Sequence, residues 1–237
     1  MDTQTDTARE AIAARVKELL ESLGQPLLAP FLADWPLTYL RREIAAARLP
    51  VLRWLPEVVG GAAPFSADLV TAVCRAAPML DWRQTYTTQD LEPAFLENYG
   101  WSEIVGSVGP IQGERIACGF LILGPATCYP SHRHAAEELY LPLSGTAAWQ
   151  QGDTQWRERA PGTTIHHRSE EPHAMRTGTA PLLALYVWRG ANLAQKARLD
   201  VSASLLVQEL RTAFHEALQC FKLVHAFQRA RYMSCCS

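Results

Sequence analysis

The sequence contains no cluster of Lys and Arg side chains and no apolar run long enough to form a membrane-spanning helix. Its 237 residues carry a formal net charge of −2 and a pI near 6.4, which gives no basic surface for nucleic acid or an anionic membrane. The first residues also lack the basic and apolar regions of a secretory signal. We therefore expect a cytoplasmic protein with no nucleic-acid partner and no membrane partner.

Cysteine pairs at the spacings of metal sites or disulfide frameworks are missing as well. The six cysteines are Cys74, Cys118, Cys128, Cys220, Cys235 and Cys236. In a reducing compartment most of them should be free thiols, with Cys74 in a helix core. Cys128 lies four residues before a histidine motif, but an inert thiol is the better interpretation of a strand or loop cysteine.

Residues 1–98 have the apolar periodicity of helices. Helices are expected over residues 7–23, 36–47 and 66–78, with a short one that begins at residue 88. Ser66 and Thr88 are suitable N-caps, because a side-chain hydroxyl can accept a hydrogen bond from the first helical turn. We interpret residues 1–98 as a helical region that covers the next part of the chain or contributes to a homodimer.

Short runs of β-branched and aromatic residues begin near Tyr99 and alternate with Gly and Pro turns. Strands are expected over residues 102–108, 115–123, 138–143, 146–150, 155–159, 173–177 and 181–188. This regular spacing indicates a mainly β fold, an antiparallel sandwich or barrel of the jelly-roll type, over residues 99–190. A helical stripe returns within residues 191–237 and predicts a C-terminal helical tail.

One stretch of the barrel region, from Tyr129 to Gly145, concentrates side chains that bind metals. It contains His132, His134, Glu138 and Tyr140. In one extended strand all four would point to the same face, because side chains alternate between faces. Imidazole and carboxylate together bind divalent Zn, Fe, Mn, Co or Ni, and three such ligands leave coordination positions open for a substrate. The stretch therefore predicts one divalent transition metal ion in a site for chemistry.

The spacing His-x-His, three residues, Glu, six residues, Gly resembles the first motif of the cupin superfamily. This resemblance implies a cupin barrel with a fourth ligand from a second motif, in which a histidine follows a turn and enters a strand. His166, His167 and His173 compete for this role. We expect His173, which follows Glu-Glu-Pro at the start of a strand, and His166 is its rival. His215 and His225, in the predicted tail, are better explained as solvated helix residues.

The resemblance narrows to the cupin-type dimethylsulfoniopropionate (DMSP) lyases, most of all to the DddL branch. Residues 95–190 carry it, and the Glu-x-Tyr extension of the histidine motif is its specific part. It implies cleavage of DMSP to dimethyl sulfide and acrylate, with Tyr140 as the catalytic base. The metal ligands that it implies are His132, His134, Glu138 and His173.

The chemistry of this substrate suggests further residues. Elimination needs a base near the carbon beside the carboxylate, and Tyr186 is a second acid–base candidate or a substrate anchor. Aromatic faces attract a sulfonium cation. The aromatic candidates in the barrel are Tyr129, Trp149, Trp156, Tyr186 and Trp188. Two other classes stay open, an Fe(II)-dependent cupin dioxygenase with the same ligands and a non-catalytic cupin that binds a sugar or effector.

Overall fold

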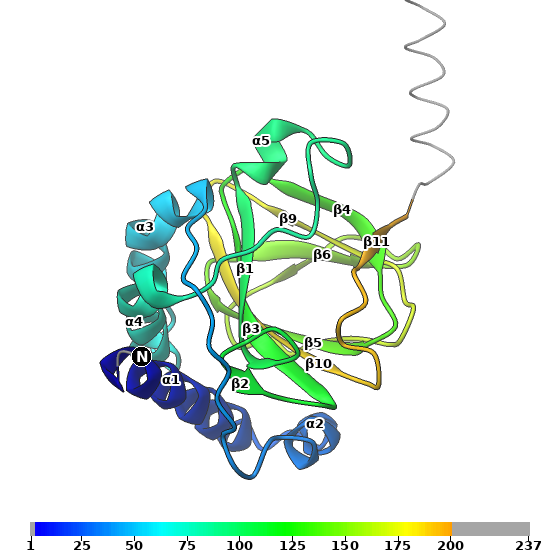
Figure 1. Cartoon of the computed structure of the whole chain (residues 1–237). Helices are drawn as coiled ribbons and strands as arrows, with labels where there is room; N and C mark the ends of the chain where they lie inside the picture. The colour runs from blue at the N-terminus through cyan, green and yellow to red at the C-terminus, as the bar shows by residue number, and fades with distance from the viewer. Residues whose placement is uncertain (1–2, 201–237) are drawn as a thin grey trace, which may run out of the picture. The chain divides into compact units, whose positions relative to one another are not determined.

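Two facing sheets form a barrel, and the N-terminal helices lie on one side of it (Figure 1). The computed structural model describes residues 3–200, of which residues 3–199 belong to one compact unit. The helices are α1 (Thr3–Ser22), α2 (Ala29–Ala33), α3 (Leu55–Gly60), α4 (Ala67–Ala76) and α5 (Pro93–Leu96), with 3₁₀ turns at Pro26–Leu28, Pro50–Trp54 and Ala77–Met79. The predicted C-terminal helix lies outside the described residues.

The first sheet has six strands in the order β2-β1-β3-β10-β5-β8, and the second has five in the order β11-β4-β9-β6-β7. The strands are β1 (Tyr99–Gly106), β2 (Ile111–Gln112), β3 (Ile116–Leu123), β4 (Cys128–Arg133), β5 (Glu137–Ser144), β6 (Ala147–Gln151), β7 (Arg157–Arg159), β8 (Ile165–His167), β9 (His173–Thr177), β10 (Leu182–Arg189) and β11 (Arg198–Leu199). All pairings are antiparallel except that of β1 with β2. The prediction of a mainly β fold, an antiparallel sandwich or barrel of the jelly-roll type, is confirmed.

The six-stranded sheet is covered on both faces, by helices outside and by the second sheet inside. Leu139, Leu141 and Leu143 of β5 pack in one cluster with Val70 of α4, whereas Tyr140 faces the barrel interior. Each of these leucines is at most 3% exposed, and burying one contributes roughly 1.5–3 kcal/mol. The alternation of β5 therefore directs its leucines to the helices, and Glu138 and Tyr140 to the interior.

The helix predictions have mixed outcomes. The helix over 7–23 is confirmed as α1, and the helix from residue 66 is confirmed as α4. Ser66 stands at the N-cap of α4, but its hydroxyl donates to the carbonyl of Leu143 at 2.7 Å instead of capping the helix. The helix expected from residue 88 is reduced to α5, and Cys74 is half-buried rather than fully in the core.

The prediction of a helix over 36–47 is wrong. This segment runs extended along the barrel and pairs through Arg41 with Ile111 and through Ala47 with Asp81. The amide of Gln112 in β2 donates to a carbonyl in the same segment, at Leu40. Two of the three leucine and isoleucine positions that suggested a helical stripe are exposed, so hydrogen bonding to the sheet edge outweighs a weak helical pattern.

The strands largely follow the prediction, but four were missed, namely β2, β4, β8 and β11. Missing β4 matters most for the site. His132 lies on β4, a turn at His134 follows, and Glu138 lies on β5 of the other sheet. The expectation that one continuous strand aligns these side chains is therefore wrong, because the chain turns between the two sheets. None of the helices in the described part of the chain combines the length and hydropathy needed to cross a bilayer.

Candidate metal and substrate site

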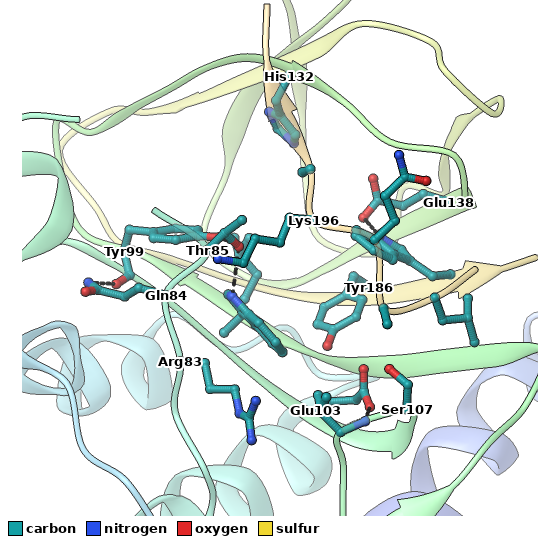
Figure 2. Close-up of a pocket in the computed structure, with 18 of the residues that line it drawn as sticks. Arg83, Gln84, Thr85, Tyr99, Glu103, Ser107, His132, Glu138, Tyr186 and Lys196 are labelled. Carbon is teal, nitrogen blue, oxygen red and sulfur yellow. Dashed lines mark hydrogen bonds between the residues drawn. The ribbon is translucent and has the colours of Figure 1, made fainter. Parts of the chain in front are cut away.

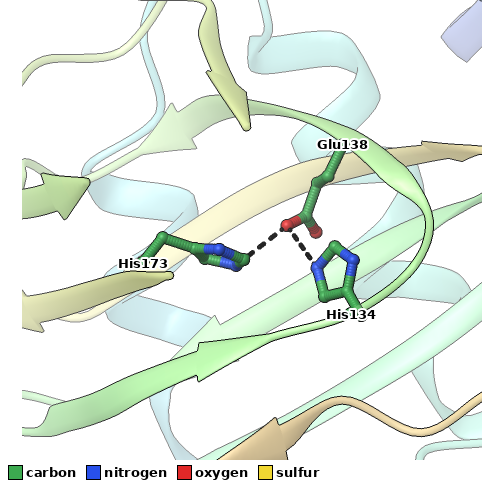
Figure 3. A group of neighbouring side chains, drawn as sticks. All are labelled: His134, Glu138 and His173. Atoms are coloured by element: carbon green, nitrogen blue, oxygen red, sulfur yellow. Dashed lines mark hydrogen bonds and ion pairs between the residues drawn. The ribbon is translucent and has the colours of Figure 1, made fainter. Parts of the chain in front are cut away.

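His134, Glu138 and His173 form a buried group whose ligand atoms all lie within 4.8 Å of one another (Figure 3). Nε2 of His134 is 3.0 Å from Oε2 of Glu138, and Nε2 of His173 is 3.1 Å from the same oxygen. β5 supplies the carboxylate, β9 supplies one histidine, and the turn between β4 and β5 supplies the other. The group therefore draws its donors from both sheets.

The backbone fixes the direction of each imidazole in this region. Nδ1 of His134 lies 2.9 Å from the carbonyl of Ala136, and Nδ1 of His173 lies 2.8 Å from the carbonyl of Glu171. A carbonyl oxygen only accepts, so each Nδ1 donates its proton, and in the neutral ring Nε2 is then the nitrogen with the lone pair that can bind a metal. Nε2 is the atom that faces the carboxylate, and a ring whose other nitrogen donates to a backbone carbonyl is typical of metal-binding histidines.

Both oxygens of Glu138 are engaged. Nε1 of Trp188 donates to Oε1 at 2.5 Å, while Oε2 faces the two histidines. Burial would raise the pKa of Glu138, but His134 and His173 outweigh it and hold this pKa well below its ordinary value. Burial lowers the pKa of His134, and the adjacent carboxylate more than reverses this, so that the pKa is raised.

A divalent cation fits this donor set. Nε2 of His173 is buried and makes no properly aligned hydrogen bond, which is costly for a polar atom away from water. One carboxylate and two neutral imidazoles form a ligand set for first-row divalent metals. The group could therefore hold a metal ion, and a fourth protein ligand or a substrate could complete it.

His132 lies beside this group without belonging to it. It pairs in register with His173, with ring centroids 4.2 Å apart, and it stacks on Tyr129 at 3.9 Å. Its Nδ1 lies 2.9 Å from the carbonyl of Pro130, so it too presents Nε2 as the free nitrogen. Burial first and the neighbouring His173 second lower its pKa well below the ordinary value. His132 is thus a neutral, oriented imidazole at the edge of the group.

The rival histidines of the second motif lie on β8. His166 points to Glu137, with Nε2 2.8 Å from Oε1, and does not join the group. His167 is fully buried and stacks on His173 with ring centroids 4.0 Å apart. Burial first, and then His173, lower the pKa of His167 to about 2, so His167 packs against His173 as a neutral ring.

A cavity of about 650 Å³ opens beside the group, and Figure 2 shows many of the residues that line it. Glu138, His132, Tyr129, Tyr140 and Tyr186 are all on its wall. Burial first and Glu138 next raise the pKa of Tyr140 well above its ordinary value, so the chain alone keeps this phenol protonated. The cavity therefore brings a candidate base next to the candidate metal ligands.

Comparison with known proteins identifies the family. The sequence model of the dimethylsulfoniopropionate lyases matches residues 38–184, which is well over half of the chain. The chain belongs to the DMSP lyase family. It is 29% identical to the DMSP lyase DddQ of Ruegeria pomeroyi over 188 residues, which cover 79% of this chain and 92% of that protein. It is 36% identical to a putative DMSP lyase DddL of Cereibacter sphaeroides over 122 residues, or 51% of this chain and 50% of that protein.

Solved structures of DMSP lyases share the fold. A chain from the crystal structures of the DMSP lyases RdDddP and RnDddQII superposes with a TM-score of 0.76 at 32% identity, covering 83% of this chain and 99% of that chain. The crystal structure of DddQ from Ruegeria pomeroyi gives a TM-score of 0.74 at 27% identity, covering 84% and 98%. The expected resemblance to cupin-type DMSP lyases is thereby confirmed.

Only some of the aromatic residues predicted to contact the substrate line the cavity of this DMSP lyase family member. Trp188 lines the cavity and lies against His134, with ring centroids 4.1 Å apart. Trp149 packs behind Tyr140 at 6.2 Å and is not on the cavity wall, and Trp156 stacks on Arg176 at 4.4 Å. The structure thus leaves Tyr129, Tyr186 and Trp188 in reach of a ligand.

The cavity also contains residues that the sequence did not indicate. Trp101 of β1 meets Tyr186 edge to face at 6.5 Å, and Glu103 of the same strand is buried on the cavity wall. Figure 2 shows the hydroxyl of Tyr186 on the side of Glu103 and away from Glu138. The only available sequence signal was alternation in β1, which places Tyr99, Trp101 and Glu103 on one face.

Proposed function

We propose that this chain is a metal-dependent carbon–sulfur lyase that cleaves DMSP to dimethyl sulfide and acrylate. The observation that carries the proposal is the convergence of His134, Glu138 and His173 beside Tyr140 in a cavity of a chain from the DMSP lyase family. We propose His132 as a fourth ligand, because its oriented Nε2 lies next to the group. A divalent ion held there would act as a Lewis acid for the substrate carboxylate and favour ionisation of the nearby phenol.

The residues of the chain would do the rest of the chemistry. Tyr140 takes the proton from the carbon beside the carboxylate, because its ring lies on the same face of β5 as Glu138. The electron pair of that C–H bond forms the double bond of acrylate, and the C–S bond breaks with its electrons passing to sulfur. Dimethyl sulfide then leaves as a neutral molecule. The hydroxyl of Tyr186 is directed away from Glu138, so we assign Tyr186 the role of a substrate anchor and not that of the base.

The site is suited to exclude water from the reaction. Tyr129 and Tyr140 are at most 4% exposed, although both lie on the cavity wall. Residues 193–197 border the cavity as well, and they lie between β10 and β11. A cytoplasmic location, a homodimer and one divalent transition metal ion (Zn, Fe, Mn, Co or Ni) are the predictions from the sequence that accompany this proposal.

The test is release of dimethyl sulfide from DMSP by purified protein under anaerobic conditions, with metal content measured on the same sample. Stoichiometric acrylate and dimethyl sulfide, lost on chelation and restored by a divalent metal, are expected. An oxygen requirement would indicate a dioxygenase instead. Binding without release of product would indicate a cupin that only holds its ligand.

A further inference from the structure

Glu103 lies at the end of a row of interior residues that begins at the proposed base. Tyr140 pairs in register with Tyr186, Tyr186 pairs with Gly119, and Gly119 pairs with Glu103. Residues in register on neighbouring strands point to the same face of a sheet. With about 4.8 Å between strands, the row spans about 14 Å from β5 to β1.

Gly119 leaves a gap in this row. A Cβ at this position would come within 2.8 Å of the Tyr186 hydroxyl and within 2.1 Å of the Ser102 carbonyl oxygen. The missing side chain leaves room for the phenol of Tyr186, and Figure 2 shows its hydroxyl on the side of Glu103. Burial first and Glu103 next raise the pKa of Tyr186 well above its ordinary value, in keeping with this proximity.

The carboxylate of Glu103 is held in a fixed position. Its Oε1 accepts hydrogen bonds from the amides of Val108 and Gly109, both at 2.7 Å. A β-bulge follows Glu103 in the pairing of β1 with β3, and bulges commonly direct a side chain into a site. The side chain is therefore oriented by its own strand and the turn that follows.

The described residues balance the charge of this buried carboxylate only in part. Glu103 is 6% exposed, and no ion pair joins it to a Lys, Arg or His of the described chain. Burial raises the pKa of Glu103 above its ordinary value, and the two backbone amides together with the more distant Arg42 and Arg83 offset this only in part. A buried carboxylate without a counter-charge is costly unless a ligand supplies one.

We infer that Glu103 is the counter-charge for the sulfonium group of the substrate and thereby selects cationic substrates. This inference rests on the proposed function. Glu138 of the metal group and Glu103 both line the cavity, and Figure 2 shows Tyr186 between them, so the cavity has a site for each end of a short zwitterion. The edge-to-face pair of Trp101 and Tyr186 adds aromatic surface where the cation would lie. The carboxylate of the substrate is directed to the metal group and its sulfur to Glu103.

The inference is tested with Glu103→Gln, which removes the charge but keeps an oxygen that can accept from Val108 and Gly109. Two unreactive ligands of nearly equal shape are compared by calorimetry on the metal-loaded protein. Protonated 3-(dimethylamino)propionate carries a cation at the position of sulfur, and 4-methylpentanoate carries neutral carbon there. Glu97→Gln, which changes an exposed carboxylate elsewhere, controls for net charge.

Glu103→Gln should weaken binding of the cationic ligand at least about tenfold, or about 1.4 kcal/mol, and change binding of the neutral ligand less than about twofold. Glu97→Gln should leave both affinities unchanged. Equal affinity of wild type and Glu103→Gln for the cation would overturn the inference. An equal loss for both ligands would overturn it too, since Glu103 would then only shape the cavity. These results stand whether or not the wild type releases dimethyl sulfide, so this inference and the proposed function can fail separately.

Discussion

Replacing Tyr140 with Phe separates the proposed base from the metal ligands beside it. The substitution removes one hydroxyl and keeps the ring, which lies between Trp149 at 6.2 Å and His167 at 6.1 Å. Glu138 loses its interaction with the Tyr140 hydroxyl but keeps its contacts with Trp188 and the two histidines, so the metal group should hold its arrangement. We therefore expect native metal content and native acrylate affinity.

Turnover should fall by a factor of about 10²–10⁴, the range for loss of a positioned acid–base group. Such a loss corresponds to an increase of about 2.7–5.5 kcal/mol in the activation free energy of the reaction. Dimethyl sulfide in the headspace measures turnover, and metal analysis and acrylate binding are measured on the same preparation. The effect should appear in kcat, because the hydroxyl acts in the transition state and not in binding.

Tyr186→Phe is the matched control, since it removes a hydroxyl from the residue paired with Tyr140 in register. That hydroxyl points to Glu103, so turnover should fall by less than about tenfold. Near-native turnover in Tyr140→Phe would refute the assignment of the base. A large loss in Tyr186→Phe instead would move the acid–base role to β10.

Three further predictions concern the metal and the thiols. His173→Ala should remove most bound metal and activity, because it deletes a donor of the buried group. His166→Ala should keep both, since that side chain points to Glu137. Loss of metal in His166→Ala with native metal content in His173→Ala would contradict the choice of His173 as a ligand. Chelation should lower the melting temperature, because a metal in hundredfold excess over its Kd stabilises the folded state by about 2.7 kcal/mol. An unchanged melting curve after verified metal removal would count against a metal ion bound between the two sheets. Reductant should leave the melting temperature unchanged, as the three described cysteines are free thiols; a marked drop would reveal a disulfide.

The sequence predicted three side chains that gather at the candidate metal site, but it did not predict the backbone path that brings them together. Histidine and glutamate at these spacings indicated a metal group, and the structure brings His134, Glu138 and His173 together. The reason given, one strand with a single face, was wrong because the chain turns at His134 and enters the other sheet. Local alternation cannot show a change of sheet, which depends on pairing between distant strands.

Two other features depend on tertiary contacts that the sequence does not reveal: the conformation of residues 36–47 and the position of Glu103. The segment over 36–47 had three apolar residues at helical spacing, yet Leu37 is fully exposed and the backbone pairs with the barrel. Glu103 sits in a stretch with no motif, and its place in the cavity depends on β3 and β10 pairing in a fixed register. Such residues become candidates only when the cavity is known.

The extended segment that replaced the expected helix has a consequence for self-association. β2 is an edge strand of the six-stranded sheet, and an open edge can recruit a strand from another molecule. Here the amide of Arg42 donates to the carbonyl of Pro110, and the amide of Gln112 donates to the carbonyl of Leu40, so the chain occupies this edge itself. A second copy therefore cannot extend the sheet past β2, which protects this side of the barrel from edge-to-edge aggregation.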